Sequence, residues 1–112
     1  IKGITPVYED PNCKHIYHLY TVCVEEAELG ASRDDFLRVL YREEGVQGIL
    51  HYQPTYDFTG LQRLGYGKHL CPNAESFFYK REINTPHHPR LTKDDCDMII
   101  AGIKNAAEKV RK

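Results

Sequence analysis

The chain has 112 residues, of which 41% are hydrophobic and 28% are charged, so one packed globular domain is expected. Lys and Arg together number 15 against 16 for Asp and Glu, and this balance lacks the basic excess of nucleic-acid-binding proteins. No run approaches the ~20 apolar residues needed to cross a bilayer. Neither a nucleic acid nor a membrane is therefore an expected partner.

The beginning of the sequence and its cysteines bear on the cellular context. The first residues contain no hydrophobic signal core and no initiator Met, which predicts a processed product or a fragment. The cysteines include no CxxC pair, so a structural zinc site is not expected. Cys23 lies in an apolar strand pattern that is typical of a buried free thiol. A reduced, cytoplasmic domain is favoured over a disulfide framework.

The first half of the sequence predicts a lead-in, a strand and a helix. Residues 1–14, with two prolines, indicate an extended or turning lead-in segment. Residues 16–24 are β-branched, aromatic or apolar on both faces, which predicts a strand that is covered on both sides. Ser32 is placed to cap the helix that follows, and Gly45 is placed to end it in a left-handed conformation.

The second half predicts two further strands and two further helices. Residues 46–52 are a strand candidate, and residues 55–72 indicate a short helical turn and a loop. We expect Asn73 to cap the next helix, residues 82–85 to form a short strand, and Thr92 to cap a long amphipathic helix. This order predicts an α+β (α/β-like) fold, with a small three- to four-stranded sheet covered by helices.

Histidine and tyrosine cluster where the second predicted strand ends, in the segment His51-Tyr52-Gln53-Pro54-Thr55-Tyr56. Loops at the end of a rigid strand often carry ligand contacts, and these rings can donate to a phosphate or sugar oxygen. Packing residues with local hydrogen-bond partners have the same pattern, and spacing alone favours that interpretation.

Two other histidine clusters invite a metal hypothesis that the spacing does not favour. His15 and His18 fall on opposite faces of the predicted strand, and we expect His18 to be a hydrogen-bonded core residue. His87 and His88 lie between two prolines in a stiff connection that offers no third ligand nearby. No metal site is predicted, and no nucleophile motif, phosphate-binding glycine loop or desolvated lysine is present. Catalytic residues are therefore not assigned.

Five segments together resemble the DegT/DnrJ/EryC1/StrS family of aminotransferases. Their order and spacing match the C-terminal region of that family, and they are HIYHLY (15–20), SRDDF (32–36), GVQGILHYQP (45–54), CPNAE (71–75) and TPHHPRLTKDD (85–95). The resemblance implies that residues 15–112 are the C-terminal small domain of a fold type I aminotransferase. It also implies that the large domain, with the pyridoxal 5'-phosphate and its Schiff-base lysine, is absent from this chain.

The resemblance carries a function for the whole protein and a limited role for this chain. Family members transfer an amino group from glutamate or glutamine to a keto-sugar, usually nucleotide-linked, and usually form homodimers. The chain alone is then expected to be inactive and prone to self-association, because surface that the preceding helix covers in the family would be exposed. His51, Tyr52 and Tyr56 are the substrate-binding candidates, and Tyr56 stands where family members often have His.

Two alternatives remain open at this point. The complete protein could be a family member that acts as a dehydratase or a regulator, depending on whether the missing half has the Schiff-base lysine. The chain could instead be an independent module that binds a sugar, a nucleotide or another partner through its His/Tyr edge. The amino donor, the acceptor sugar and the pathway are not specified by these residues.

Overall fold

Three short antiparallel strands form the centre of the computed structural model, which describes residues 1–111. They lie in the order β1-β2-β3 and comprise β1 (Ile4–Pro6), β2 (Tyr20–Val24) and β3 (Glu82–Thr85). In β2 the central Val22 is paired with Pro6 on one side and Ile83 on the other. This sheet, with its helices, confirms the predicted α+β class.

The predicted strand over residues 16–24 is confirmed only from Tyr20 onward. Tyr20 pairs with Thr85, the last residue of β3, and the Pro86 that follows has no N–H to continue the ladder. Tyr17 has a φ of 48°, and its backbone N–H is bound by the ring of His15, so the chain has left the extended conformation there. The strand expectation for residues 16–19 was therefore wrong.

The lead-in over residues 1–14 is not wholly irregular, because it contains the edge strand β1. Ile4 pairs with Val24, and the backbone N–H of Glu25 donates to the Gly3 carbonyl oxygen at 2.8 Å. Gly3 has a φ of 78°, and a Cβ there would lie 2.6 Å from the backbone of Leu29. Only glycine fits this close approach, which positions β1 against the end of the short helix that follows β2.

Three helices accompany the sheet, and two of them begin as the sequence predicts. They are α1 (Glu26–Leu29), α2 (Arg33–Arg42) and α5 (Lys93–Val110). Ser32 caps α2 by accepting from the backbone of Asp35, and Thr92 caps α5 in a reciprocal capping box with Asp95. Gly45 follows α2 with a φ of 68°, as predicted.

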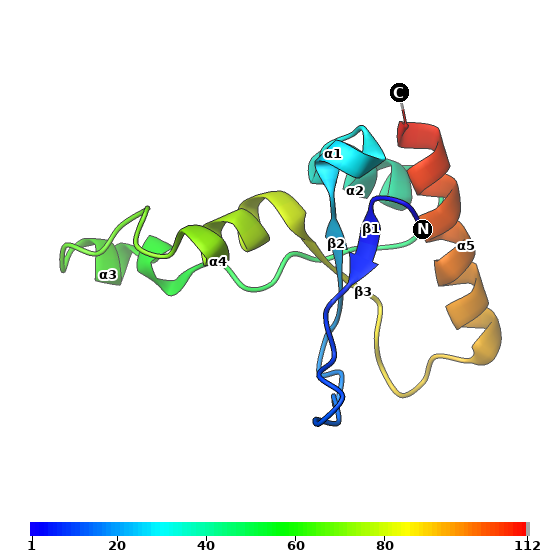
Figure 1. Ribbon diagram of the computed structural model, residues 1–112, viewed down its shortest axis with the longest axis horizontal. Helices are drawn as coiled ribbons and strands as arrows, with labels where there is room; N and C mark the ends of the chain where they lie inside the picture. Colours follow the sequence, from blue (N-terminus) through cyan, green and yellow to red (C-terminus); the bar gives the residue numbers. More distant parts are fainter. Residues whose placement is uncertain (112) are drawn as a thin grey trace.

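The core lies between the apolar face of the sheet and the pair α2–α5. The residues that pack there with no exposed surface include Val24 and Ile83 from the strands, Phe36 and Leu40 from α2, and Ala106 and Ala107 from α5. In Figure 1 the α5 helix stands beside the sheet with α2 close to its C-terminal half. Cys23 points to the opposite face, where it is a buried free thiol whose pKa is raised by burial, which confirms the prediction for this residue.

A helical arm projects away from this body, as Figure 1 shows. It contains four short helical segments, η1 (Thr55–Asp57), α3 (Thr59–Gln62), α4 (Pro72–Ser76) and η2 (Phe77–Arg81), the last of which runs directly into β3. The prediction of Asn73 as the cap of α4 was wrong. Cys71 occupies the cap position and Pro72 the first helical position, where its missing N–H leaves no bond unmade.

Arg33 joins the arm to the body. Its side chain is only 6% exposed, and its guanidinium donates to the carbonyl oxygens of Phe78, Tyr79 and Glu82 at 2.9–3.1 Å. The last carbonyls of a helix have no partner within the helix, so Arg33 satisfies groups at the end of η2 that would otherwise be unpaired.

Within residues 1–111 the structure has no helix of the length and apolar character that crossing a bilayer requires.

Candidate functional site

The segment that precedes His51 lies against β3, but it does not form the predicted strand. Residues 46–52 make a single bridge, in which the backbones of Ile49 and Asn84 exchange hydrogen bonds of 2.8 and 2.9 Å. The Asn84 side chain then donates to the carbonyl oxygens of Ile49 and His51, at 3.3 and 3.5 Å. The expectation of a strand here was wrong because a side chain, and not a continuing ladder, occupies these carbonyls.

Asn84 belongs to a polar network on the second face of the sheet. Its Oδ1 accepts from the Thr21 hydroxyl at 2.5 Å, and its Nδ2 also donates to Oε2 of Glu82 at 2.9 Å. Glu82 has no exposed surface. Its burial raises the pKa of its carboxyl to about 7, while a hydrogen bond from the His51 backbone and the charge of Arg33 oppose the rise. A carboxyl that is partly protonated near neutral pH therefore lies beneath the His51 segment.

His51 and Tyr52 present two rings side by side at the end of this segment. The ring centroids are 4.8 Å apart with an interplanar angle of 25°, which is a stacked arrangement. Tyr52 is 68% exposed, whereas His51 is half-buried and its Nδ1 is buried without a hydrogen-bond partner. The exposed Tyr52 ring, stacked on the half-buried His51, offers a flat apolar surface with a hydroxyl at its rim, which suits a base or sugar ring.

Tyr56 differs from this pair in both exposure and bonding. Its ring is buried and its hydroxyl donates to Oε1 of Glu75 at 2.9 Å. Burial and this hydrogen bond raise the pKa of Tyr56 to about 12. Burial alone would raise the pKa of Glu75, but hydrogen bonds from Tyr56 and the His69 backbone outweigh it and lower that pKa. Tyr56 therefore joins η1 to α4 within the arm, and its hydroxyl is already engaged.

A groove runs beside His51 and includes residues that the sequence placed in a separate cluster. Its volume is about 380 Å³, and both His87 and His88 line it together with His51 and Asn84. The Ile49–Asn84 bridge explains the meeting, because it holds the chain before His51 next to the residues that follow β3. The structure thus brings two of the three histidine clusters together. Among residues 1–111 no group of three or more His, Cys, Asp or Glu is arranged to hold a metal ion.

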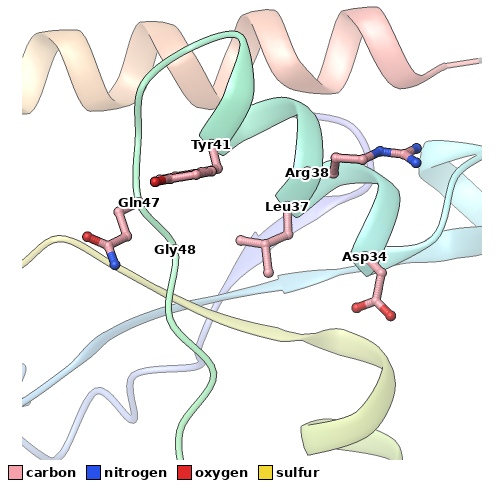
Figure 2. A pocket seen from close by; sticks show the side chains of 6 residues that line it. All are labelled: Asp34, Leu37, Arg38, Tyr41, Gln47 and Gly48. Carbon is pink, nitrogen blue, oxygen red and sulfur yellow. The ribbon is translucent and has the colours of Figure 1, made fainter.

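A second hollow, of about 410 Å³, is lined by residues of α2 and by Gln47 and Gly48 of the same segment (Figure 2). The Tyr41 ring from α2 and the Gln47 side chain project near one another, and Leu37 projects toward Gly48. A Cβ on Gly48 would lie 2.6 Å from side-chain atoms of both Leu37 and Ile83. Glycine therefore allows the segment to pass closely between α2 and β3, and Gln47 lines both hollows.

The two histidines of the third cluster, His15 and His18, do not line the groove beside His51. His15 bonds the backbone N–H of Tyr17 through its Nδ1 at 2.8 Å, and the Tyr17 hydroxyl donates to Glu9 at 2.7 Å. The prediction of His18 as a core histidine was wrong. His18 is exposed because β2 begins only at Tyr20, so the sheet does not extend to it. Sequence reasoning also missed Asn84 and Glu82. A carboxylate and a carboxamide two residues apart share one face of the predicted strand 82–85, and this is the signal that could have identified them.

Residues 1–111 do not form a pyridoxal phosphate site. That cofactor requires a lysine held inside a pocket for its Schiff base. Every lysine in residues 1–111 is exposed, and the charged side chains buried there are Arg33 and Glu82. Arg33 is occupied by three backbone carbonyls, which leaves it unavailable for a phosphate group. The described residues therefore contain no buried lysine and no free buried cation that could hold this cofactor.

The fold defines a class when it is compared with solved structures. A putative sugar aminotransferase, Spr1654 from Streptococcus pneumoniae, matches in its PMP form with a TM-score of 0.79 and 30% identity, over 96% of this chain and 27% of that one. Its PLP form matches with a TM-score of 0.78 and 29% identity, over 98% of this chain and 28% of that one. The small sheet and its helices are therefore similar to about a quarter of that protein.

The sequence comparisons lead to the family. Residues 1–104 match the model of the DegT/DnrJ/EryC1/StrS aminotransferase family, and the chain belongs to this family. The spore coat polysaccharide biosynthesis protein SpsC of Bacillus subtilis is 30% identical over 103 residues, which are 91% of this chain and 26% of that protein. The UDP-4-amino-4,6-dideoxy-N-acetyl-beta-L-altrosamine transaminase of Campylobacter jejuni is 30% identical over 95 residues, which are 85% and 24% respectively. The chain thus spans about a quarter of the length of these relatives.

Proposed function

We propose that this chain is the small-domain part of a pyridoxal-phosphate-dependent aminotransferase that aminates a nucleotide-linked keto-sugar, and that it supplies substrate contacts. Membership of the family and similarity to sugar aminotransferases support the reaction class. The name of the Campylobacter relative supports a UDP-linked amino sugar as the class of substrate. Residues 15–112 would be the domain itself, with residues 1–14 as its lead-in.

The observation that carries the proposal is the stacked pair of His51 and Tyr52. Tyr52 is the exposed ring, and the segment that holds it is tied to β3 through both the backbone and the side chain of Asn84. A rigidly held aromatic surface loses little entropy when a ring stacks on it, so it orients a ligand at low cost. His51 and Tyr52 would bind and orient the nucleotide-sugar, with no catalytic group in this chain.

Tyr56 enters the proposal through its place in the arm. Since its ring is buried and its hydroxyl donates to Glu75, its role would be to fix the arm beside the substrate rather than to contact the ligand directly. When bound to the rest of such an enzyme, the cofactor supplies the electron sink for amino-group transfer. This chain's residues would orient the sugar and exclude water from one side of it.

The experiment is a titration of the chain with UDP-N-acetylglucosamine, followed by the aromatic NMR resonances of its tyrosines and histidines. The proposal predicts saturable shifts of His51 and Tyr52, and loss of those shifts in Tyr52→Ala. The matched control is Tyr66→Ala, because Tyr66 is also an exposed tyrosine but lies in the arm beyond α3. Shifts that survive Tyr52→Ala, or that Tyr66→Ala abolishes equally, contradict the proposed contact.

A further inference from the structure

The groove beside His51 is a second feature of the same edge, and its walls come from two segments far apart in the sequence. One wall is the segment that ends at His51, and the other is the turn after β3 that carries His87 and His88. A role for this groove rests on the proposed function, because the groove would hold a part of the same ligand.

The groove is held open by bonded structure and is not a gap between loose loops. Two backbone hydrogen bonds join Ile49 to Asn84, and the Asn84 side chain adds bonds to the carbonyls of Ile49 and His51. Asn84 is itself fixed by Thr21 and Glu82. After β3, Pro86 restricts the backbone that carries the two histidines. The relative positions of the two walls are thus set before any ligand binds, as in most ligand sites.

The chemistry of the lining favours a neutral, hydroxyl-rich ligand. The polar side chains are three imidazoles with Gln47, Asn84 and Thr85, and the groove has no Lys, Arg, Asp or Glu in its lining. A phosphate group is normally met by Arg, Lys or a row of backbone N–H groups, and such charged partners are lacking in these walls. The side chains of Asn84 and Thr85 are already bonded within the sheet, which leaves the imidazoles and Gln47 for a ligand. Imidazole and carboxamide groups both donate and accept, which matches the alternating needs of sugar hydroxyls.

The remaining walls and the size point the same way. Leu19, Ile49 and Pro86 supply apolar surface, which suits the C–H face of a sugar ring. The volume of about 380 Å³ lies near the lower end of the roughly 300–1,000 Å³ of ligand pockets, so one sugar ring is a better fit than a whole nucleotide-sugar. His88 also accepts from the Arg90 backbone through Nδ1 at 3.3 Å, which leaves Nε2 as the donor of the neutral ring.

We infer that this groove, between His51 on one wall and His87 and His88 on the other, is the subsite for the sugar ring of the ligand. The nucleotide end would then lie outside the groove, on the exposed side of Tyr52. The inference gives His87 and His88 a binding role in place of the metal role that their adjacency first suggests.

The test follows the ring protons of the six histidines by NMR while the chain is titrated separately with N-acetylglucosamine, UDP and UDP-N-acetylglucosamine. We expect the free sugar to shift His51, His87 and His88 and to leave His15, His18 and His69 unchanged. UDP alone should leave His87 and His88 unchanged. The double variant His87→Ala/His88→Ala should raise the Kd for the sugar about tenfold, the size expected for one or two lost hydrogen bonds.

The control variant is His69→Ala, since His69 is a highly exposed histidine of the arm outside the groove. Its Kd should equal that of the unchanged chain. The inference is overturned if the sugar shifts no resonance of a groove histidine, or if UDP alone shifts those of His87 and His88. An equal increase of the Kd in His69→Ala also overturns it. If UDP-N-acetylglucosamine moves Tyr52 while His87 and His88 stay unchanged, the inference fails and the proposed function stands. If the sugar shifts the resonances of the groove histidines while the nucleotide-sugar never shifts those of Tyr52, the inference stands and the proposed function fails.

Discussion

Arg33 and Tyr79 lie 46 residues apart in the chain, and Nη2 of Arg33 donates to the Tyr79 carbonyl oxygen at 2.9 Å. The same guanidinium bonds the carbonyls of Phe78 and Glu82, so one side chain fixes where the arm ends and where β3 begins. Because β3 carries Asn84, which bonds the His51 segment, Arg33 also supports the candidate site indirectly. This explains structurally why an Arg follows the capping Ser in the SRDDF segment.

We predict that Arg33→Lys lowers the free energy of unfolding by about 2–3 kcal/mol, because an ammonium cannot reach three carbonyls in the way a planar guanidinium does. Urea denaturation followed by circular dichroism measures this change. Arg38→Lys is the matched control, since Arg38 is exposed and its pairing with Asp35 is a surface ion pair, so a change within about 0.5 kcal/mol is expected. Equal losses of free energy of unfolding in both variants would contradict the stabilising role of the Arg33 hydrogen bonds to the three carbonyls.

Gly48→Ala should also destabilise the chain, by about 1–3 kcal/mol, because the new methyl group would meet Leu37 and Ile83 at 2.6 Å. The comparison is Gly60→Ala, where a Cβ has no neighbour within 4 Å and where less freedom in the unfolded chain gives a small gain in stability. Thermal unfolding of the two variants distinguishes them. If Gly48→Ala is neutral, the segment does not pass between α2 and β3 as described.

Glu82 should give the chain an unusual dependence on pH. Its pKa is about 7 in the folded chain, above the ordinary value near 4.5, so the folded state holds the proton more tightly than the unfolded state does. The contribution of Glu82 to the free energy of unfolding is then fully present below about pH 4.5 and is lost as the pH rises to about 7. The size of this effect is on the order of 3 kcal/mol.

The variant Glu82→Gln removes that titration without changing the shape of the side chain. We expect its free energy of unfolding relative to the unchanged chain to rise between pH 4.5 and pH 7.5, as measured by urea denaturation at each pH. Other carboxylates, such as Asp95 with its lowered pKa, act in the opposite direction and cancel in the comparison. A difference that is constant over this range would show that Glu82 does not titrate there.

Tyr56→Phe should raise the pKa of the Glu75 carboxyl, because it removes a hydrogen bond that holds this pKa down. Carbon-detected NMR of the glutamate carboxyls as a function of pH reports this directly. Tyr66→Phe serves as the control, since Tyr66 is an exposed tyrosine of the same arm. An unchanged Glu75 pKa in Tyr56→Phe would show that the Tyr56–Glu75 hydrogen bond is absent in solution.

The apolar surface between β2 and α5 should make the chain self-associate. Tyr20 and Ile100 are both more than 40% exposed, and they adjoin a hollow of about 320 Å³ whose lining is mainly apolar. Exposed apolar patches of this kind drive association. Sedimentation at several concentrations should show dimers or larger species for the unchanged chain and a monomer for Ile100→Glu. A single monomeric species at high concentration in the unchanged chain contradicts this prediction.

The parts of the fold that the sequence predicted are those with local signals. Ser32 and Thr92 cap helices through residues only three positions away, and Pro86 ends β3 through its own missing N–H. Strand β1 was missed because its short pattern is interpretable only beside β2. The extent of β2 was overestimated for the same reason, since its length depends on what its neighbours can pair.

The candidate site shows the same limit. His51 and Tyr52 were proposed from the sequence as substrate contacts, but their proximity to His87 and His88 depends on Asn84. The contact between residues 49–51 and β3 spans more than thirty positions, and no local pattern encodes it. Tyr56 lay in the same segment as His51, yet its hydroxyl is turned to Glu75 within the arm.

The most direct measurement of the central claim uses pyridoxal phosphate itself. The chain is incubated with this cofactor, reduced with borohydride, and analysed by intact-mass spectrometry and peptide mapping, with the urea-unfolded chain as the reference. Because every lysine in residues 1–111 is exposed and none lies in a buried pocket, we predict scattered, substoichiometric labelling that matches the unfolded chain. Stoichiometric labelling of one lysine in the folded chain would contradict the claim that this chain carries substrate contacts without the cofactor site.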